Sequence, residues 1–210
     1  QPSRSPAERL TDNHRMHADS SSSDTGVLVV SATRSEARHI PDGTRLLVTG
    51  IGKVAASVAL TRELSTGPAV TRIVNIGTAG ALHDHHLPVG HEGLFVPSAV
   101  VEHDISSTEL RAMGYPIVDR WELPDGDGTV LATGDTFVAD PVRRAELAAG
   151  ADLVDMEGAA IAHVAAAFGV PCRLVKVVTD GADEGAMDWP SLVDEAARTL
   201  GRWVSQHLIG

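Results

Sequence analysis

The stretch from Asp152 to Asp183 constrains the fold of this 210-residue chain more than any other part of it. The pattern predicts a short strand at 151–154, a helix of small residues at 158–168 and an apolar strand at 173–178. Gly169 follows the helix, where glycine commonly ends a helix because it tolerates a left-handed conformation. A strand, a helix and a buried strand in this order are typical of an α/β sheet.

Two acidic residues stand at the ends of these elements. Glu157 directly precedes the helix, and Asp180 follows the apolar strand. Taken singly, Glu157 also suits a first helical turn, where negative charge favours the helix dipole, and Asp180 suits a turn before glycine. Ligands of α/β sheets usually bind at the carboxyl ends of the strands, and the valines before Asp180 indicate a buried strand. We therefore predict that both acids belong to one ligand site.

The rest of the chain also alternates between strands and helices, which predicts an α/β fold. Strands are expected at 27–31, 45–49, 72–76, 94–101 and 129–132, and helices at 53–65 and from about residue 190 onward. The sequence Gly-Thr-Ala-Gly at 77–80 is expected to form a tight turn after the third strand, before a further helix. Pro97 indicates an edge strand or a bulge, and residues 103–127 are expected to be rich in loops.

Apolar residues at helical spacing predict the buried sides of two helices. In the helix at 53–65 these residues are Val54, Val58 and Leu64. In the last helix every fourth residue is apolar, at Leu192, Ala196, Leu200, Val204 and Leu208.

Composition indicates which macromolecular partners and which cellular location to expect. The formal net charge of −11 argues against nucleic acid and anionic membranes as partners. No apolar run approaches the roughly 20 residues of a membrane-spanning helix, and the N-terminus lacks the apolar core of a signal peptide, so a cytoplasmic location is expected. Polar residues 1–26 are expected to be a disordered extension, which leaves 27–210 as one domain.

Two groups of potential metal ligands or nucleophiles are interpreted as structural. The sequence His83-Asp84-His85-His86 lacks the ligand spacing of a zinc site, so it is interpreted as a solvated loop. Cys172 is the single cysteine, and its apolar surroundings favour a packed thiol over a nucleophile. We expect neither a metal nor a cofactor.

Five motifs occur in an order that resembles a known family. They are GIGKVAASVAL (50–60), NIGTAGAL (75–82), TGDTFV (133–138), VDMEGAAIAHVAAAFGVP (154–171) and VVTDGAD (177–183). Over about residues 27–208 they resemble the purine nucleoside phosphorylase superfamily, and most closely its 5′-methylthioadenosine/S-adenosylhomocysteine nucleosidases. The resemblance implies a three-layer α/β fold whose central mixed, twisted sheet is flanked by helices.

The resemblance also implies roles for the acidic residues. Asp180 matches the aspartate that protonates, or hydrogen-bonds, N7 of the purine. Glu36 matches the glutamate that holds the attacking water. Glu157 matches the glutamate that binds the ribose hydroxyls, with Met156 packed under the sugar. The other implied substrate-binding residues are Phe137, stacked on the base, Val138, at the base edge, Thr78, Ala79 and Gly80, beside ribose and water, and Ile51 and Thr179.

These residue types suit cleavage of an N-glycosidic bond. A protonated acid at N7 improves a poor leaving group, and carboxylates stabilise the positive charge that develops on the ribose. By analogy with glycoside hydrolysis, a second carboxylate activates water. Asp180 would need a raised pKa for the role of acid, which apolar surroundings favour.

Asn75 favours water over phosphate as the nucleophile. Phosphorylases of the superfamily hold phosphate with arginines, one of them just before the glycine-rich segment, and Asn75 occupies that position here. The chain also departs from the nucleosidases. Only residues 37–44 separate the first strand region from the next motif, Thr33 replaces an apolar residue near the 5′-substituent, and Lys176 replaces an arginine.

Several readings stay open at the level of sequence. Phosphorolysis of a nucleoside, hydrolysis of a futalosine-type compound, and nucleoside binding without catalysis are alternatives to cleavage of a thioether nucleoside. The resemblance implies a small purine nucleoside as ligand and a homodimer in which the neighbour completes the pocket for the 5′-substituent.

Overall fold

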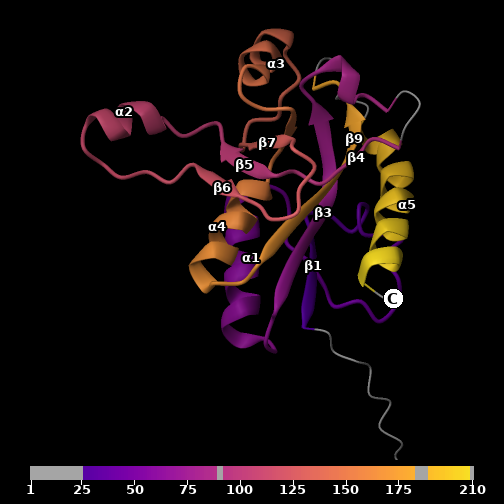
Figure 1. Cartoon of the computed structure of the whole chain (residues 1–210). Coiled ribbons are helices and arrows are strands. Elements are labelled where there is room, and N and C mark those ends of the chain that lie inside the picture. The colour runs from indigo at the N-terminus through magenta and orange to yellow at the C-terminus, as the bar shows by residue number, and fades with distance from the viewer. Residues whose placement is uncertain (1–25, 89–91, 183–188, 209–210) are drawn as a thin grey trace, which may run out of the picture.

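A computed structural model of the protein describes residues 26–88, 92–182 and 189–208 (Figure 1). The extension predicted at 1–26 lies outside these residues except for Gly26, whose carbonyl accepts a hydrogen bond from Thr71 N. The strands are β1 (Val27–Ser31), β2 (Leu46–Val48), β3 (Arg72–Ala81), β4 (Leu94–Phe95), β5 (Ala99–Glu102), β6 (Arg120–Glu122), β7 (Val130–Thr133), β8 (Leu153–Asp155) and β9 (Cys172–Asp180). The helices are α1 (Lys53–Thr66), α2 (Ser107–Ala112), α3 (Pro141–Ala148), α4 (Gly158–Phe168), α5 (Trp189–Leu208) and the 3-10 turn η2 (Asp84–His86).

The strands form one mixed sheet in the order β2-β1-β3-β8-β7-β5-β6, and β9 pairs with both β3 and β4. The pairs β1·β2, β1·β3, β3·β9, β5·β7 and β7·β8 are parallel. The pairs β3·β8, β4·β9 and β5·β6 are antiparallel. The parallel strands bring the carboxyl ends of β1, β3 and β9 to the same edge of the sheet.

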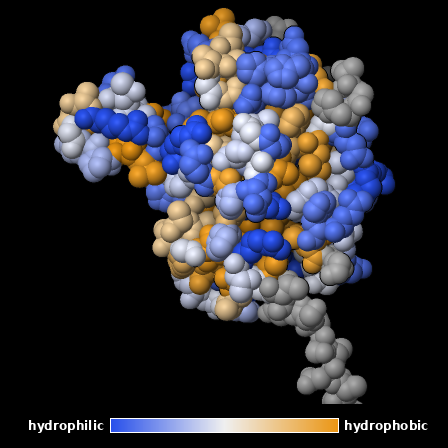
Figure 2. Space-filling view, viewed as in Figure 1, coloured by the Kyte–Doolittle hydropathy of each residue, from blue (hydrophilic) through white to orange (hydrophobic). Residues whose placement is uncertain are grey.

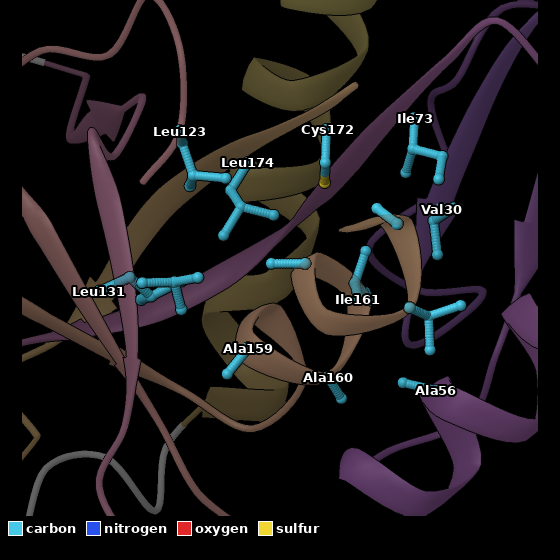
Figure 3. Packing of buried hydrophobic residues seen from close by; sticks show 14 of the residues in the cluster. Val30, Ala56, Ile73, Leu123, Leu131, Ala159, Ala160, Ile161, Cys172 and Leu174 are labelled. Atoms are coloured by element: carbon cyan, nitrogen blue, oxygen red, sulfur yellow. The ribbon is translucent and has the colours of Figure 1, made fainter. Parts of the chain in front are cut away.

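Helices cover both faces of this sheet and complete three layers. On one face, α5 packs its buried residues Ala196, Leu200, Trp203 and Val204 against valines and an isoleucine of β1, β3 and β9. On the other face, α1 and α4 pack against each other and against the sheet (Figure 1). Figure 3 shows Ala159, Ala160 and Ile161 of α4 among Leu131, Leu174 and Ala56. The predicted three-layer α/β fold is confirmed.

The tight turn predicted at residues 77–80 is wrong, because these residues continue strand β3. Gly77 pairs with Lys176 and Thr78 with Val177 of β9, and the register shifts between Ala79 and Gly80. Glycine is usually disfavoured in a strand, but the β9 ladder supplies backbone hydrogen bonds along this segment. The further helix expected after the turn is also absent from residues 81–83, which lead into η2.

The single strand predicted at residues 94–101 is also wrong. The segment forms two strands, β4 and β5, that pair with different partners, β9 on one side and β6 and β7 on the other. Pro97 lies between them and has no N–H for a ladder, so the chain changes partner there. The loop-rich region 103–127 contains α2 and β6, and α3 at 141–148 was not predicted.

The buried side predicted for α1 is only partly correct. Val54 is 73% exposed and Val58 is 54% exposed, whereas Ala56 and Leu60 are buried. Leu64 packs against the core as predicted. The small Ala56 lets α1 approach the alanine-rich α4, so close helix packing rather than residue hydrophobicity selects the buried face. In α5, Ala196, Leu200 and Val204 are buried as predicted, Leu208 is partly buried and Leu192 is exposed.

The structure also describes the single cysteine, the membrane-spanning potential of the helices and an arm that carries α2. Cys172 is buried in the core, and burial raises the pKa of its thiol to about 12, which confirms a packed cysteine. None of the helices in the described part of the chain combines the length and hydrophobicity that a membrane span requires. Figure 2 shows the segment that carries α2 standing out from the body as an arm with both polar and apolar residues.

Candidate active site

A cavity of about 150 Å³ lies at the carboxyl ends of the central strands. Its wall is built from the residues after β1, the ends of β3, β8 and β9, and the segments before α1 and α3. Every residue predicted for the site lines this cavity, namely Glu36, Ile51, Thr78, Ala79, Gly80, Phe137, Val138, Met156, Glu157, Thr179 and Asp180. The structure therefore brings these residues together at one cavity, and their roles stay predictions.

Glu36 is held in place by Thr33 and Thr78. It is only 4% exposed and lies in the turn after β1. Its Oε2 accepts hydrogen bonds from Thr33 N at 3.1 Å and Thr33 Oγ1 at 2.9 Å, and Glu36 N donates back to Thr33 Oγ1 at 3.2 Å. Its Oε1 accepts from Thr78 N at 2.9 Å and Thr78 Oγ1 at 3.0 Å. Four donors therefore fix the orientation of this carboxylate at the cavity wall.

Asp180 ends β9, with its carboxylate bound to neighbouring residues. Thr179 Oγ1 donates to Asp180 Oδ2 at 2.8 Å, and Ala182 N donates to Asp180 Oδ1 at 2.9 Å. Gly80 of β3 makes this approach feasible, because a Cβ there would lie 2.9 Å from Ala182 Cβ and 3.0 Å from Asp180 Oδ1. The strand β3 thus passes close under the carboxylate without displacing it.

Glu157 occupies the N-cap position of α4, but its side chain makes no capping hydrogen bond. Its Oε1 accepts a hydrogen bond from Gly52 N at 2.7 Å, which ties the segment before α1 to the site. Burial raises the pKa of Glu157 to about 7, and the nearby Asp155 carboxylate adds to this rise, while Lys176 and the Gly52 N–H oppose it. A carboxyl group of this kind changes its charge near neutral pH.

An ion pair lies beneath these carboxylates. Lys176 Nζ is 2.8 Å from Asp155 Oδ2, and the two side chains are 2% and 1% exposed. Burial by itself lowers the pKa of Lys176, but the surrounding carboxylates outweigh it and raise the pKa above its usual value. Lys176 is therefore a buried ammonium, and Asp155 is its direct partner.

Five lining residues were not among the predicted site residues. They are Ala32, Thr33, Thr136, Val154 and Asp155. Thr33 and Glu36 have the spacing of a capping box, a signal that links the two side chains. Lys176 interrupts an apolar strand, and a buried lysine needs an acidic partner. In the structure, this acidic partner is Asp155.

Asn75 does not line the cavity. It is 1% exposed, and its Nδ2 donates to Val30 O at 3.1 Å and to Ile76 O at 3.3 Å. The side chain therefore lies within the sheet rather than at the cavity. Among the described lining residues there is no lysine, arginine or histidine.

The rings of the histidines after β3 lie close to one another, and those of His83 and His85 are stacked. The ring centroids of His85 and His86 are 4.1 Å apart, and those of His83 and His85 are 5.3 Å apart. Over residues 26–88, 92–182 and 189–208, no group of three His, Cys, Asp or Glu side chains is arranged to hold a metal ion.

This arrangement suits a neutral ligand that carries several hydroxyl groups. Carboxylates accept hydrogen bonds from hydroxyls, and a partly protonated carboxyl group also serves as an acid or a base. Phe137 is 48% exposed at the cavity and offers an aromatic surface for a planar ring.

Comparison with known proteins connects this site to a family. A sequence model of the phosphorylase superfamily matches residues 43–127 and 127–208. The chain is 32% identical over 174 residues to the 5′-methylthioadenosine/S-adenosylhomocysteine nucleosidase of Shewanella frigidimarina, covering 70% of this chain and 73% of that one. The corresponding nucleosidase of Shewanella denitrificans is 34% identical over 174 residues, with the same coverage of 70% and 73%.

Solved structures share the fold. A futalosine hydrolase mutant of Helicobacter pylori strain 26695 has a TM-score of 0.74 at 23% identity, covering 85% of this chain and 96% of that chain. The 5′-methylthioadenosine/S-adenosylhomocysteine nucleosidase of Neisseria meningitidis, in complex with methylthio-immucillin-A, has a TM-score of 0.73 at 23% identity, covering 86% and 96%. Because the family model and these relatives each span more than two thirds of the sequence, the chain belongs to the phosphorylase superfamily of nucleoside phosphorylases and nucleosidases.

Proposed function

We propose that this protein hydrolyses the N-glycosidic bond of a purine nucleoside, 5′-methylthioadenosine or S-adenosylhomocysteine, and releases adenine. The observation that carries the proposal is the convergence of Glu36, Glu157 and Asp180, from three separate elements, on one small cavity without a lining cation among the described residues. The curated relatives with this activity at 32% and 34% identity support the same substrates.

Asp180 is the general acid in this mechanism. As the C1′–N9 bond breaks, its electron pair passes to the purine, and Asp180 supplies a proton to N7 or holds one there. The apolar strand behind Asp180 and the Thr179 hydroxyl restrict its movement, which keeps the carboxyl group directed toward the base.

Glu36 and Glu157 act on the sugar side. Glu36 orients a water molecule and takes its proton as the water oxygen bonds to C1′. Glu157 accepts hydrogen bonds from the ribose hydroxyls, above Met156, and its negative charge stabilises the cationic sugar in the transition state. The Thr33 and Thr78 donors keep Glu36 in one orientation for this step.

The remaining lining residues bind the substrate without taking part in proton transfer. Phe137 stacks on the purine, and the backbone of Val138 binds the edge of the base. Thr78, Ala79 and Gly80 lie beside the ribose and the water. Ile51 and Thr179 complete the wall of the pocket.

Hydrolysis is favoured over phosphorolysis by the charge of the cavity. A phosphate dianion needs fixed cationic donors, and no basic side chain lines the cavity among the described residues. Lys176, which is buried, is paired with Asp155, a residue that lines the cavity.

Two other functions are candidates, and one of them is supported by a specific observation. Hydrolysis of a futalosine-type nucleoside is the second candidate, because the fold is also similar to a futalosine hydrolase of Helicobacter pylori at a TM-score of 0.74. A nucleoside-binding protein without catalysis is the third, and the complete set of three carboxylates at the cavity argues against it.

The active unit in this proposal is a homodimer. Ile51, which lines the cavity, is 58% exposed, and Val54 and Val58 of the following helix α1 are 73% and 54% exposed. An exposed apolar surface of this kind is typical of a contact between subunits. The proposed setting is adenine and methionine salvage in the cytoplasm.

Release of free base tests the function directly. The purified chain is incubated with 5′-methylthioadenosine, S-adenosylhomocysteine, adenosine, inosine and a futalosine-type nucleoside, each with and without phosphate. We expect adenine from the two thioether nucleosides at the same rate with and without phosphate. Release that requires phosphate would establish a phosphorylase instead. Release only from a futalosine-type compound would establish the second candidate, and binding without release would establish the third.

A further inference from the structure

The start of α4 is capped by residues other than its N-cap residue. Gly158 N donates to Asp155 Oδ2 at 3.0 Å and to Oδ1 at 3.2 Å, and Ala159 N donates to Thr133 Oγ1 at 2.9 Å. Thr133 Oγ1 in turn donates to Asp155 Oδ1 at 2.5 Å. The first amides of a helix normally bind the side chain of the N-cap residue. Asp155 and Thr133 take over this function, so the Glu157 side chain extends toward Gly52 and the cavity.

Asp155 also binds the buried ammonium beneath the site. Its Oδ2 is 2.8 Å from Lys176 Nζ, and both side chains are almost fully buried. Lys176 also lies near Glu36, because a Cβ on Gly77 would be 3.3 Å from Lys176 Nζ and 3.1 Å from Glu36 Oε1. Asp155 therefore neutralises a charge that would otherwise act more strongly on the two carboxylates at the cavity wall.

We infer that Asp155 is a positioning residue of the active site. By capping α4 and binding Lys176, it leaves the Glu157 carboxylate available to the hydroxyl groups of the substrate and determines the charge that Glu157 experiences. This role in substrate binding rests on the proposed function, whereas the coupling between Asp155 and Glu157 does not.

The groups that face Glu157 determine the direction in which Asp155 shifts the pKa of Glu157. They are Asp155 on β8, Lys176 on β9, Glu36 after β1 and the Gly52 N–H before α1. Burial and Asp155 raise the pKa of Glu157, while Lys176 lowers it. Hydroxyl groups donate to the ionised carboxylate, so nucleoside affinity falls as the pH drops through the pKa of Glu157. Without the charge of Asp155, Glu157 stays ionised to a lower pH.

The substitution Asp155→Asn tests this inference. Asparagine keeps a side-chain oxygen for Gly158 N but removes the negative charge beside Glu157. We expect the midpoint of the pH dependence of nucleoside affinity, and of kcat/KM, to move down by about one pH unit. The matched control is Thr133→Val, which removes the hydrogen bonds of the Thr133 hydroxyl with Ala159 N and with Asp155 but keeps both charges, so its midpoint stays at the wild-type pH. Equal midpoints in the wild type and both variants would overturn the inference.

A second variant covers the case in which Asp155→Asn does not fold, because it leaves Lys176 with one partner fewer. The double substitution Asp155→Asn with Lys176→Met removes both members of the ion pair, and such replacements are better tolerated than loss of one partner. The two charges act on Glu157 in opposite directions, so we expect the midpoint to return toward the wild-type pH. A double variant shifted down as far as the single variant would contradict the proposed coupling.

The free energy of unfolding provides a measurement without substrate. Folding raises the pKa of Glu157 from 4.5 to about 7, so its contribution to stability is complete below 4.5 and is lost as the pH rises through about 7. We expect this loss to be smaller in Asp155→Asn than in the wild type and in Thr133→Val. If the wild type released no base but this difference held, the proposed function would fail and the coupling would stand. If the wild type released base but this difference were absent, the coupling would fail and the proposed function would stand.

Discussion

At the scale of single residues, the proposed division of labour between Asp180 and Glu36 makes a direct prediction. Asp180→Asn and Glu36→Gln each keep the size of the side chain but replace the carboxyl group with an amide, which does not act as a general acid or base. We expect each to lower kcat for base release by about 10² or more, because a general acid or base contributes that much. Circular dichroism and the unfolding midpoint check that both variants stay folded. Asp42→Asn, at an exposed turn away from the cavity, is the matched control and keeps wild-type activity. Nearly full activity in either site variant would contradict the mechanism.

At the scale of elements, the connection between β2 and α1 depends on Gly52. Its φ of 94° lies in the left-handed region, and a Cβ there would lie 3.0 Å from Asp135 Oδ1. Its N–H donates to Glu157 Oε1 at 2.7 Å. We expect Gly52→Ala to lower the free energy of unfolding by about 1–2 kcal/mol and to raise KM, because the connection moves away from Glu157.

Gly43 offers the matched control for this prediction. It has a φ of 84°, and a Cβ there would meet nothing within 4 Å. Gly43→Ala therefore carries a similar conformational cost without affecting the site, so we expect lower stability with an unchanged KM. Urea unfolding and steady-state kinetics on both variants separate the two effects. Equal KM values would show that the position of Gly52 does not matter for substrate binding.

At the scale of the whole molecule, the exposed apolar face of α1 predicts how two chains associate. Val54 and Val58 are 73% and 54% exposed, although the sequence predicted them to be buried. We expect the double substitution Val54→Glu with Val58→Glu to convert a dimer to a monomer, because charges at the centre of an interface are costly to bury. Size-exclusion chromatography with light scattering measures the mass. Leu192→Glu, on α5 at the opposite face of the sheet, is the control and leaves the mass unchanged. A dimer in the α1 variant would place the interface elsewhere.

Much of the site could be predicted from the sequence because its parts lie at the ends of strands. Glu36 follows β1, Thr78 to Gly80 end β3, and Asp180 ends β9. Parallel strands bring their carboxyl ends together regardless of how far apart they lie in the chain. Local patterns therefore identified Glu157, Asp180 and the helix α4, whose small residues and terminal Gly169 lie within one segment, whereas Glu36 was identified through the family resemblance.

Other features were decided by contacts between distant segments. A glycine-rich segment such as residues 77–80 is compatible with a turn or with a strand. Pairing with β9 makes this segment part of β3. The buried side of α1 depended on its close approach to α4, which favoured Ala56 over two larger valines.

The sequence by itself indicated most of the residues that surround the cavity, because the motifs and the strands that carry them are local signals. Only the tertiary structure decided how those residues are charged and held. The ion pair of Asp155 with Lys176 joins β8 to β9, and the bond from Gly52 to Glu157 joins the start of α1 to that of α4. Burial and the charges brought together by folding set the pKa of Glu157, and both depend on the packing of the whole chain.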